Sequence, residues 1–364
     1  MATATTTLET PVADLRRMIR EVVDGQELTF DDAVAAMDAI MTGTVSGAQI
    51  GALVTALRMR GETVEEIAGF ATAMRRHARR VEIPGDGGPV VDTCGTGGDA
   101  SGTFNISTTA AFVMAGAGAR VAKHGNRAMT SRCGSADLLE GLGVAIELSP
   151  MAVAQCVAGV GIGFMYAPAF HPAMRFVGPA RREIGIRTVF NILGPLTNPA
   201  GASHQLIGVG HPEIAAKLAR VLARLGSRRA VLVHAEEGLD ELGIAGPSVV
   251  TEYDARGETF TTFIVTPQEF GLEGGEPGSL DGGDVERNVA ITRAILAGEP
   301  GPRRSVTLLN AGVGLYAAEA AGSIGEGIEL AAAAIDSGRA AATVERLVRL
   351  SQRLAAPPSD GDGA

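Results

Sequence analysis

A glycine-rich segment, Asp92-Thr93-Cys94-Gly95-Thr96-Gly97-Gly98-Asp99, lies between an expected strand and an expected helix. Glycines let backbone N–H groups approach a phosphate without steric conflict, and the start of a helix adds positive potential. The segment also matches the GxGxxA pattern of dinucleotide-binding proteins from Gly95 to Ala100. However, residues 100–136 contain no Asp or Glu that could hold a ribose hydroxyl. A plain turn and a phosphate-binding loop are the interpretations that stay open.

A local basic patch follows this loop. Residues 100–136 carry four positive charges within a chain whose 31 basic and 41 acidic residues give a net charge of −10. Together with the hydroxyl and amide side chains around them, these cations are typical of a site for a small polyanion. A basic surface loop is the alternative. The patch consists of Asn105, Ser107, Thr108, Thr109, Arg120, Lys123, Asn126, Arg127, Thr130, Ser131, Arg132 and Ser135.

Two further groups could complete such a site. Asp240-Glu241 follows an expected strand, and adjacent carboxylates supply the hard oxygen ligands that Mg²⁺ prefers. Arg181, in Pro179-Ala180-Arg181-Arg182, could bind a carboxylate through two parallel hydrogen bonds. On the residues alone, a solvated turn or helix start for the acidic pair and a surface helix for Arg181 are the favoured explanations.

The composition excludes several other functions. The three cysteines form no CxxC pair, and the chain contains no HExxH or GxSxG motif. The net negative charge argues against binding to nucleic acid or an anionic membrane. Residues 1–12 lack a signal peptide, and Leu148–Met174, although uncharged, is interrupted by Gly and Pro too often for a membrane span. We therefore expect a cytoplasmic protein.

The secondary-structure elements that would position these residues fall into two regions of the chain. Up to about residue 80 the apolar spacing predicts only helices, with Ser46 capping one of them and Thr63-Val64-Glu65-Glu66 forming a capping box on the next. These helices are expected at 14–24, 30–41, 46–61 and from 63, with Arg75, Arg76, Arg79 and Arg80 on a solvated face. From Pro89, short strands alternate with helices, which predicts a mostly parallel sheet with flanking helices.

The expected α/β elements extend almost to the end of the chain. The strands are predicted at 89–92, 120–123, 162–167, 206–210 and 230–234, with a strand pair at 248–265 around Ala255-Arg256-Gly257. The helices are predicted at 107–117, 136–142, 149–160 and 213–225, and again after Asp284 to about Leu354. We expect residues 1–88, joined by part of 172–198, to form a helical domain. Residues 89–364 would form the α/β domain, with 355–364 a disordered tail.

Several motifs resemble the anthranilate phosphoribosyltransferase family in order and spacing, from about residue 13 to 353. The motifs are DTCGTGGD (92–99), GTFNIST (102–108), KHGNR (123–127), GSAD (134–137), APAFHPAMR (167–175), GPAR (178–181), RTVFNILGPLTNP (187–199) and GLDE (238–241). The resemblance implies transfer of a phosphoribosyl group from phosphoribosyl diphosphate (PRPP) to the amine of anthranilate, in tryptophan biosynthesis. It implies the fold of class IV phosphoribosyltransferases and pyrimidine nucleoside phosphorylases, and a homodimer joined through the helical domain.

The resemblance also implies the roles of individual residues. Ser107, Asp240 and Glu241 would bind Mg²⁺, while Gly95, Asn126 and Arg181 would bind anthranilate, with Arg181 on its carboxylate. Catalysis would be electrostatic, assisted by Lys123, without a general base. The implied PRPP site comprises Gly95, Gly98, Asp99, Thr103, Asn105, Ile106, Ser107, Thr108, Lys123, His124, Gly125, Asn126, Arg127, Ala128, Met129, Thr130, Ser131 and Ser135.

Three positions depart from the pattern expected of the family. Met129-Thr130 replaces a Val-Ser pair, Cys133 replaces a Ser, and Gly243-Ile244-Ala245 replaces Ser-Leu-Thr after the acidic pair. The last departure would affect how the Asp240–Glu241 loop is braced. Two alternatives stay open, a pyrimidine nucleoside phosphorylase and a non-catalytic nucleic-acid-binding relative. The intact GLDE and GPAR motifs and the net negative charge favour the transferase.

Overall fold

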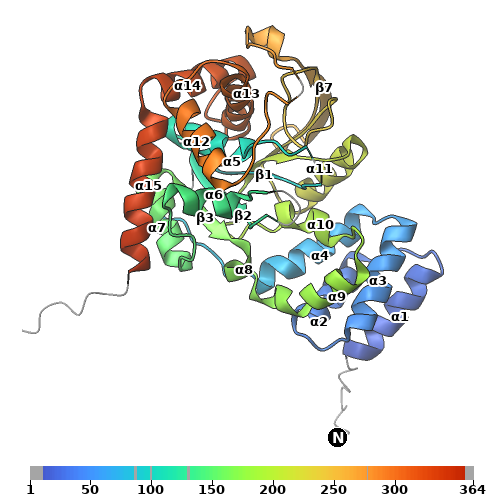
Figure 1. Ribbon diagram of the computed structural model, residues 1–364. Coiled ribbons are helices and arrows are strands. Elements are labelled where there is room, and N and C mark those ends of the chain that lie inside the picture. The colour runs from blue at the N-terminus through green and yellow to red at the C-terminus, as the bar shows by residue number, and fades with distance from the viewer. Residues whose placement is uncertain (1–10, 86–87, 99–100, 129–131, 277, 357–364) are drawn as a thin grey trace, which may run out of the picture. The chain divides into compact units, whose positions relative to one another are not determined.

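The computed structural model describes residues 11–85, 88–98, 101–128, 132–276 and 278–356 (Figure 1). The predicted positions Asp99, Met129, Thr130 and Ser131, and residues 357–364 of the predicted tail, lie outside these ranges. Contacts between residues divide the chain into two compact units. The first unit comprises Met1–Ala78 and His171–Thr197, and the second comprises Arg79–Phe170 and Asn198–Ala364.

The first unit is helical. Two of its first four helices begin at the caps that the sequence predicts: Ser46 and Thr63 each accept a backbone hydrogen bond and form a capping box with the residue three positions on. The buried Glu66 also accepts the N–H of Leu28, which ties the last helix of the four to the loop before the second. The helices are α1 (Pro11–Val23), α2 (Phe30–Met41), α3 (Gly47–Arg60) and α4 (Val64–His77).

The rest of this unit comes from residues 171–197, which form short helices. These are η1 (Pro172–Phe176), α9 (Gly178–Ile184), α10 (Phe190–Leu193) and η2 (Gly194–Leu196). The predicted solvated face of α4 is wrong at Arg75. This side chain is half-buried and donates to the Leu196 carbonyl at 2.7 Å, because the second segment of the unit covers that face. Arg76, Arg79 and Arg80 are exposed, as predicted.

The second unit is built on one sheet. Within the described residues, seven strands lie in the order β3-β2-β1-β4-β5-β6-β7, with the first five parallel and the last two added antiparallel. The sheet is therefore mostly parallel, as the alternation of elements predicts. The strands are β1 (Val90–Gly95), β2 (Arg120–Gly125), β3 (Ile162–Tyr166), β4 (His204–Gly208), β5 (Arg229–Ala235), β6 (Ser248–Asp254) and β7 (Thr259–Val265).

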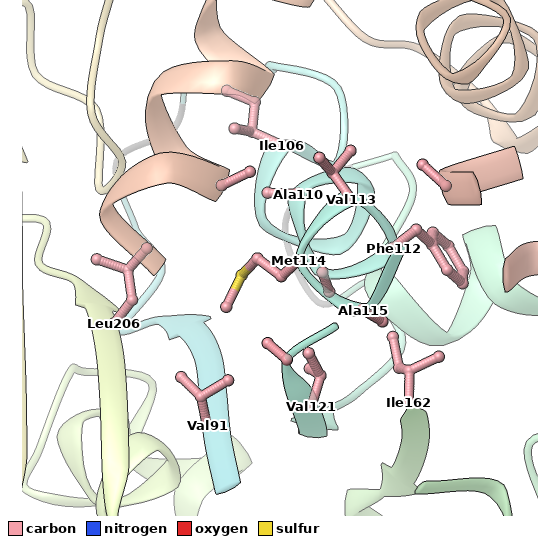
Figure 2. Close-up of a cluster of buried hydrophobic side chains, with 14 of the residues drawn as sticks. Val91, Ile106, Ala110, Phe112, Val113, Met114, Ala115, Val121, Ile162 and Leu206 are labelled. Atoms are coloured by element: carbon pink, nitrogen blue, oxygen red, sulfur yellow. The ribbon is translucent and has the colours of Figure 1, made fainter. Parts of the chain in front are cut away.

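The helices of this unit cover the sheet, and the chain after the last strand is mainly helical. Figure 2 shows α5 with Met114 and Ala115 near Val91, Val121 and Ile162 of the strands. The chain after Asp284 is helical, as predicted. The helical elements are α5 (Ile106–Gly116), α6 (Ser135–Leu142), α7 (Pro150–Val160), α8 (Ala167–Phe170), η3 (Pro212–Ile214), α11 (Ala215–Arg224), η4 (Pro267–Phe270), α12 (Val285–Leu296), α13 (Pro302–Ala317), α14 (Ile324–Asp336) and α15 (Arg339–Ala355).

The uncharged stretch from Leu148 forms α7, a turn at Gly161 and the buried strand β3, as the breaks in its sequence predict. Gly161 ends α7 with a φ of 95°, a conformation that favours glycine. None of the described helices is both long and apolar enough to span a bilayer.

The strand order identifies the edge of the sheet where a ligand is expected. From β1 the chain moves to β2 and β3 on one side and then returns to β4 on the other side. In open parallel sheets, ligands bind beyond the carboxyl ends of the strands at the point where this direction reverses. That point lies between β1 and β4, whose last residues, Gly95 and Gly208, are paired.

Candidate active site

The glycine loop after β1 lies against the acidic loop after β5. The Gly97 N–H donates to Oδ2 of Asp240 at 2.7 Å, and the Thr96 N–H donates to the Gly208 carbonyl at 2.8 Å. A Cβ on Gly95 would lie 2.4 Å from Oδ2 of Asp240, and a Cβ on Gly208 would lie 1.5 Å from its carbonyl oxygen. Glycine is required at both strand ends because the backbone and carboxylate of Asp240 fill the space of a side chain.

The acidic loop is braced through its backbone rather than through side chains at 243–245. Oε1 of Glu237 accepts the N–H groups of Ile244 and Ala245, and the Gly243 N–H donates to Ser248 Oγ at 3.1 Å. A Cβ on Gly243 would lie 1.8 Å from Oε1 of Glu237. The departure at Gly243 therefore goes together with a glutamate that occupies the space of the missing side chain.

Lys123 is buried near the end of β2, and its ammonium group points to two elements of the site. Its Nζ donates to the Thr93 carbonyl of β1 and lies 3.4 Å from Ser107 Oγ in the first turn of α5. Burial lowers the pKa of Lys123, while the negative charges of Asp92 and Glu241 oppose that shift. Within the described residues, no carboxylate lies at ion-pair distance from Lys123.

Asp92 supports this lysine, although no motif reasoning from the sequence gave it a role. It is fully buried on β1, where Oδ1 accepts the His124 N–H at 3.2 Å and Oδ2 accepts Nδ2 of Asn198 at 2.7 Å. Asn198 also donates to the Ala122 carbonyl at 2.8 Å. Burial raises the pKa of Asp92, and Lys123 and these hydrogen bonds oppose the shift. The network fixes the residues on both sides of Lys123.

The start of α5 leaves polar groups available. Asn105 stands at the cap position but its side chain makes no capping hydrogen bond; it donates instead to the carbonyl and sulfur of Cys133 at 3.2 and 3.4 Å. Thr108 Oγ1 is buried without a hydrogen-bond partner in the described parts of the chain. An uncapped helix start with a buried, unsatisfied hydroxyl is suited to an anion. Cys133 thus contributes its carbonyl and its sulfur to the position of the Asn105 side chain.

The loop after β2 is held in place by the start of α6. Oδ2 of Asp137 accepts the N–H groups of Ala128 and Gly134, both at 2.9 Å, and Ser135 Oγ donates to the Asn126 carbonyl at 3.2 Å. Arg127, a predicted ligand of PRPP, is exposed and forms ion pairs with Asp137 and Glu140. One carboxylate therefore fixes the backbone at Ala128 and at Gly134.

The second unit thus brings together most of the predicted residues. Gly95, Ser107, Lys123, Asp240 and Glu241 converge at the carboxyl ends of β1, β2, β4 and β5. Thr103 lies on the loop before α5, where it forms a β-bridge with Asp281. The remaining described positions lie at the end of β2, in the two neighbouring loops, or at the starts of α5 and α6; they are Gly98, Asn105, Ile106, Thr108, His124, Gly125, Asn126, Arg127, Ala128 and Ser135.

Arg181 belongs to the first unit, on α9. Its guanidinium lies over the ring of Phe190, 5.7 Å from the ring centroid, and half-burial lowers its pKa. Within the described residues, no side chain or carbonyl forms an ion pair or hydrogen bond with this guanidinium. The cation is therefore presented on an aromatic surface and not neutralised by a carboxylate of its own unit.

The donor set of the second unit suits Mg²⁺. It offers the carboxylates of Asp240 and Glu241 and the hydroxyl of Ser107, all hard oxygen ligands, and no cluster of three or more His, Cys, Asp or Glu side chains occurs in the described ranges. Mg²⁺ commonly binds through one or two carboxylates and completes its shell with waters and substrate phosphates. The thiol of Cys94, which would favour a softer metal, is kept protonated because burial and Asp92 raise its pKa well above the ordinary value.

Comparisons with known proteins agree with this geometry. The helical bundle domain of a glycosyl transferase family matches residues 16–78, and the a/b domain of the same family matches residues 87–341. Anthranilate phosphoribosyltransferase of Chloroflexus aggregans is 55% identical over 340 residues, which cover 93% of this chain and 99% of that protein. The enzyme of Symbiobacterium thermophilum is 51% identical over 342 residues, or 94% and 99% of the two chains.

Solved structures give the same result. Anthranilate phosphoribosyltransferase from Thermus thermophilus has a TM-score of 0.87 at 44% identity, covering 92% of this chain and 99% of that one. The Saccharomyces cerevisiae enzyme in complex with PRPP and Mg has a TM-score of 0.85 at 29% identity, covering 94% and 98%. These matches identify neither a pyrimidine nucleoside phosphorylase nor a non-catalytic nucleic-acid-binding relative, the two alternatives that the sequence left open. The chain belongs to the anthranilate phosphoribosyltransferases, enzymes of tryptophan biosynthesis within this glycosyl transferase family.

Proposed function

We propose that the strand-end site of the second unit binds PRPP together with Mg²⁺, and that Arg181 of the first unit binds the carboxylate of anthranilate. The observation that carries the proposal is the convergence of Lys123, the uncapped start of α5 and the Asp240 carboxylate on one sheet edge. A sugar pyrophosphate needs cations, helix N–H groups and a divalent metal in one place. The yeast relative was solved with PRPP and Mg.

The reaction requires little acid–base chemistry. The amine of an aromatic acid such as anthranilate is unprotonated at neutral pH and can attack C1 of the ribose directly. The C1–O bond breaks, its electron pair leaves with pyrophosphate, the new C1–N bond forms, and the amine loses a proton. Most of the barrier is therefore the developing charge of the leaving group, which positioning and preorganised electrostatics can lower.

Each residue of the site has a part in that stabilisation. Lys123, the Ser107 and Thr108 N–H groups of α5 and the glycine-loop amides would bind the phosphate oxygens. Asp240, Glu241 and Ser107 would hold Mg²⁺, which supplies positive charge to the departing pyrophosphate. The buried Asp92 network holds the backbone on either side of Lys123. Asn126 and Gly95 would contact anthranilate. The same enzyme from yeast was also solved with 4-fluoroanthranilate.

The direct test follows the loss of anthranilate fluorescence on addition of PRPP, with and without Mg²⁺. We expect turnover only when both PRPP and Mg²⁺ are present. The Asp240→Asn, Glu241→Gln double variant should need far more Mg²⁺ and turn over more slowly, since its neutral amides are poor metal ligands. Metal titrations that coincide for the double variant and the parent enzyme would contradict the assignment of these two carboxylates.

We further propose a cytoplasmic homodimer joined through the helical domain, which comprises residues 1–88 and part of 172–198, with 89–364 as the α/β domain. Apolar side chains on the surface of the helical unit support self-association: Met59 is 84% exposed and Val23 is 67% exposed. Three free thiols are consistent with a reducing compartment. Light scattering should give twice the monomer mass for the parent chain and a smaller mass for Met59→Glu.

A further inference from the structure

Two buried asparagines of the C-terminal helices make hydrogen bonds to the loops of the site. Asn288 on α12 is 1% exposed and Asn310 on α13 is fully buried. Both lie outside the motifs on which the sequence resemblance rests. In each asparagine, the amide oxygen and the amide nitrogen both form hydrogen bonds to backbone groups. Three of these six groups, the Asn105 N–H and the N–H and carbonyl of Leu242, are distant in the sequence.

Asn310 fixes the residue that follows the acidic pair. Its Oδ1 accepts the Leu242 N–H at 3.1 Å, and its Nδ2 donates to the Leu242 carbonyl at 3.0 Å and to the Val306 carbonyl at 2.9 Å. Leu242 is itself fully buried, so water is excluded as a substitute partner. The amide pairs with both backbone groups of one residue, as a neighbouring strand would, and a shift of Leu242 would carry Asp240 and Glu241 with it.

Asn288 fixes the start of α5. Its Oδ1 accepts the Asn105 N–H at 3.1 Å and Nδ2 of Asn105 at 3.2 Å. Its own Nδ2 donates to the carbonyls of Gly283 and Asp284 at 3.0 and 2.9 Å. Asn105 in turn reaches Cys133, so one buried amide determines the position of the helix start and of the loop beside it.

We propose that Asn310 and Asn288 are positioning residues of the substrate site, Asn310 for the metal-binding acidic pair and Asn288 for the phosphate-binding start of α5. The proposal rests on the proposed function of that site. Both tasks require a donor and an acceptor on one short, neutral side chain, because each asparagine serves N–H and C=O groups at once. A carboxylate could not donate, and an alanine would leave buried backbone groups unpaired.

The two residues should therefore have different kinetic signatures. Asn310→Ala should raise the Mg²⁺ concentration needed for half-maximal activity about 10–100-fold, the usual effect of losing a group that orients metal ligands. Asn288→Ala should raise the KM for PRPP by more than it changes the Mg²⁺ requirement. A merely structural role predicts no such split, because general loosening would change both quantities together.

Matched controls exist one turn away on the same helices. Thr307 is fully buried on α13, but its Oγ1 donates to the Arg303 carbonyl within the helix. Ile291 is 5% exposed on α12, one turn after Asn288, and has an apolar side chain. Thr307→Val and Ile291→Val each change a buried side chain that forms no hydrogen bond to Leu242 or Asn105, and we expect near-parental Mg²⁺ and PRPP dependence.

The experiment measures PRPP binding by titration calorimetry over a series of Mg²⁺ concentrations, alongside activity and thermal unfolding of all variants. We expect the Mg²⁺ dependence of PRPP binding to shift for Asn310→Ala, and PRPP affinity at saturating Mg²⁺ to fall for Asn288→Ala. If either alanine variant does not fold, the serine variant, which keeps one hydrogen-bonding atom, replaces it and should show a smaller shift in the same direction.

Two failures are distinguishable. If the Mg²⁺ and PRPP dependence of the asparagine variants changes no more than that of the control variants of equal thermal stability, the positioning roles are wrong while the site stands. The same holds if each asparagine variant changes both dependences equally. If the parent enzyme itself fails to bind PRPP in the presence of Mg²⁺, the proposed function of the site is wrong.

Discussion

Lys123 and Arg229 are both buried cations of the same sheet, but their surroundings are opposite. Arg229, at the start of β5, is 7% exposed and bonds Glu252 Oε1 at 2.7 Å, the Tyr316 carbonyl at 3.2 Å and the Tyr316 hydroxyl at 2.7 Å. Lys123, near the end of β2, is 3% exposed and meets one carbonyl and, at 3.4 Å, one hydroxyl. Arg229 is therefore saturated, in the sense that a carboxylate and two further oxygens accept its hydrogen bonds. Lys123 is unsaturated, because it bonds no carboxylate directly in the described parts of the chain.

The two cations lie at opposite ends of the parallel strands. Arg229 lies at the amino end of its strand, away from the expected ligand edge, and its guanidinium also stacks 4.0 Å from the centroid of the Tyr316 ring. Lys123 lies toward the ligand edge, where burial lowers its pKa because no carboxylate forms a direct pair with it in the described ranges. A buried charge without a partner is costly in the free protein, and a polyanionic substrate would supply the missing partner.

Replacing the saturated cation should affect stability most. Arg229→Met leaves the buried Glu252 with the Tyr316 hydroxyl but without its cationic partner, and losing one member of a buried ion pair destabilises by about 3–5 kcal/mol. We expect the free energy of unfolding in urea to fall by that amount. The KM values and kcat of the remaining folded enzyme should stay at parental levels, because the cluster lies at the other end of the sheet. A large loss of kcat with an unchanged free energy of unfolding would show that Arg229 serves catalysis and not stability.

Replacing the unsaturated cation should affect catalysis most. Lys123→Met removes a preorganised charge beside the leaving group, and such groups contribute about 10²–10³-fold to kcat. The unfolding free energy of Lys123→Met should fall less than that of Arg229→Met, because Lys123 bonds no carboxylate directly within the residues described and Asp92, whose charge it partly compensates, keeps its hydrogen bonds from His124 and Asn198. Steady-state kinetics and urea unfolding of the two variants side by side measure both effects. If Lys123→Met were the less stable of the two, the lysine would be a structural residue.

Arg181 extends the comparison to the helical unit, since it too lacks a carboxylate partner among the described residues. Arg181→Ala should raise the KM for anthranilate about 10–100-fold, which corresponds to the roughly 1.5–3 kcal/mol of a hydrogen bond to a charged group. The KM for PRPP should change much less. Arg182→Ala is the matched control, because this neighbour on α9 is exposed. A larger rise in the KM for PRPP than in the KM for anthranilate would contradict the assignment of Arg181 to the anthranilate carboxylate.

The sequence predicted what depends on local patterns. The helix starts at Ser46 and Thr63 are set by residues three positions apart, and the glycine loop, Lys123 and the acidic pair lie in contiguous motifs. The supports of the site could not be predicted in this way. Asp92 and Asn198 meet across 106 positions, and the Asn105–Asn288 bond spans 183. Arg75 shows the same limit, since its apparent solvent face is covered by a segment 121 residues further on.

The smallest effect should come from removing the Tyr316 hydroxyl, which bonds both Arg229 and Glu252. Tyr316 donates to Glu252 Oε1 at 3.1 Å and accepts from Arg229 at 2.7 Å, so Tyr316→Phe removes these bonds but keeps the ring under the guanidinium. Arg229 retains its direct bond to Glu252, and the loss should be about 0.5–1.5 kcal/mol. Urea unfolding checks the size, and unchanged kinetics check the location. A loss as large as that of Arg229→Met would mean that the hydroxyl, and not the Arg229–Glu252 pair, holds the cluster together.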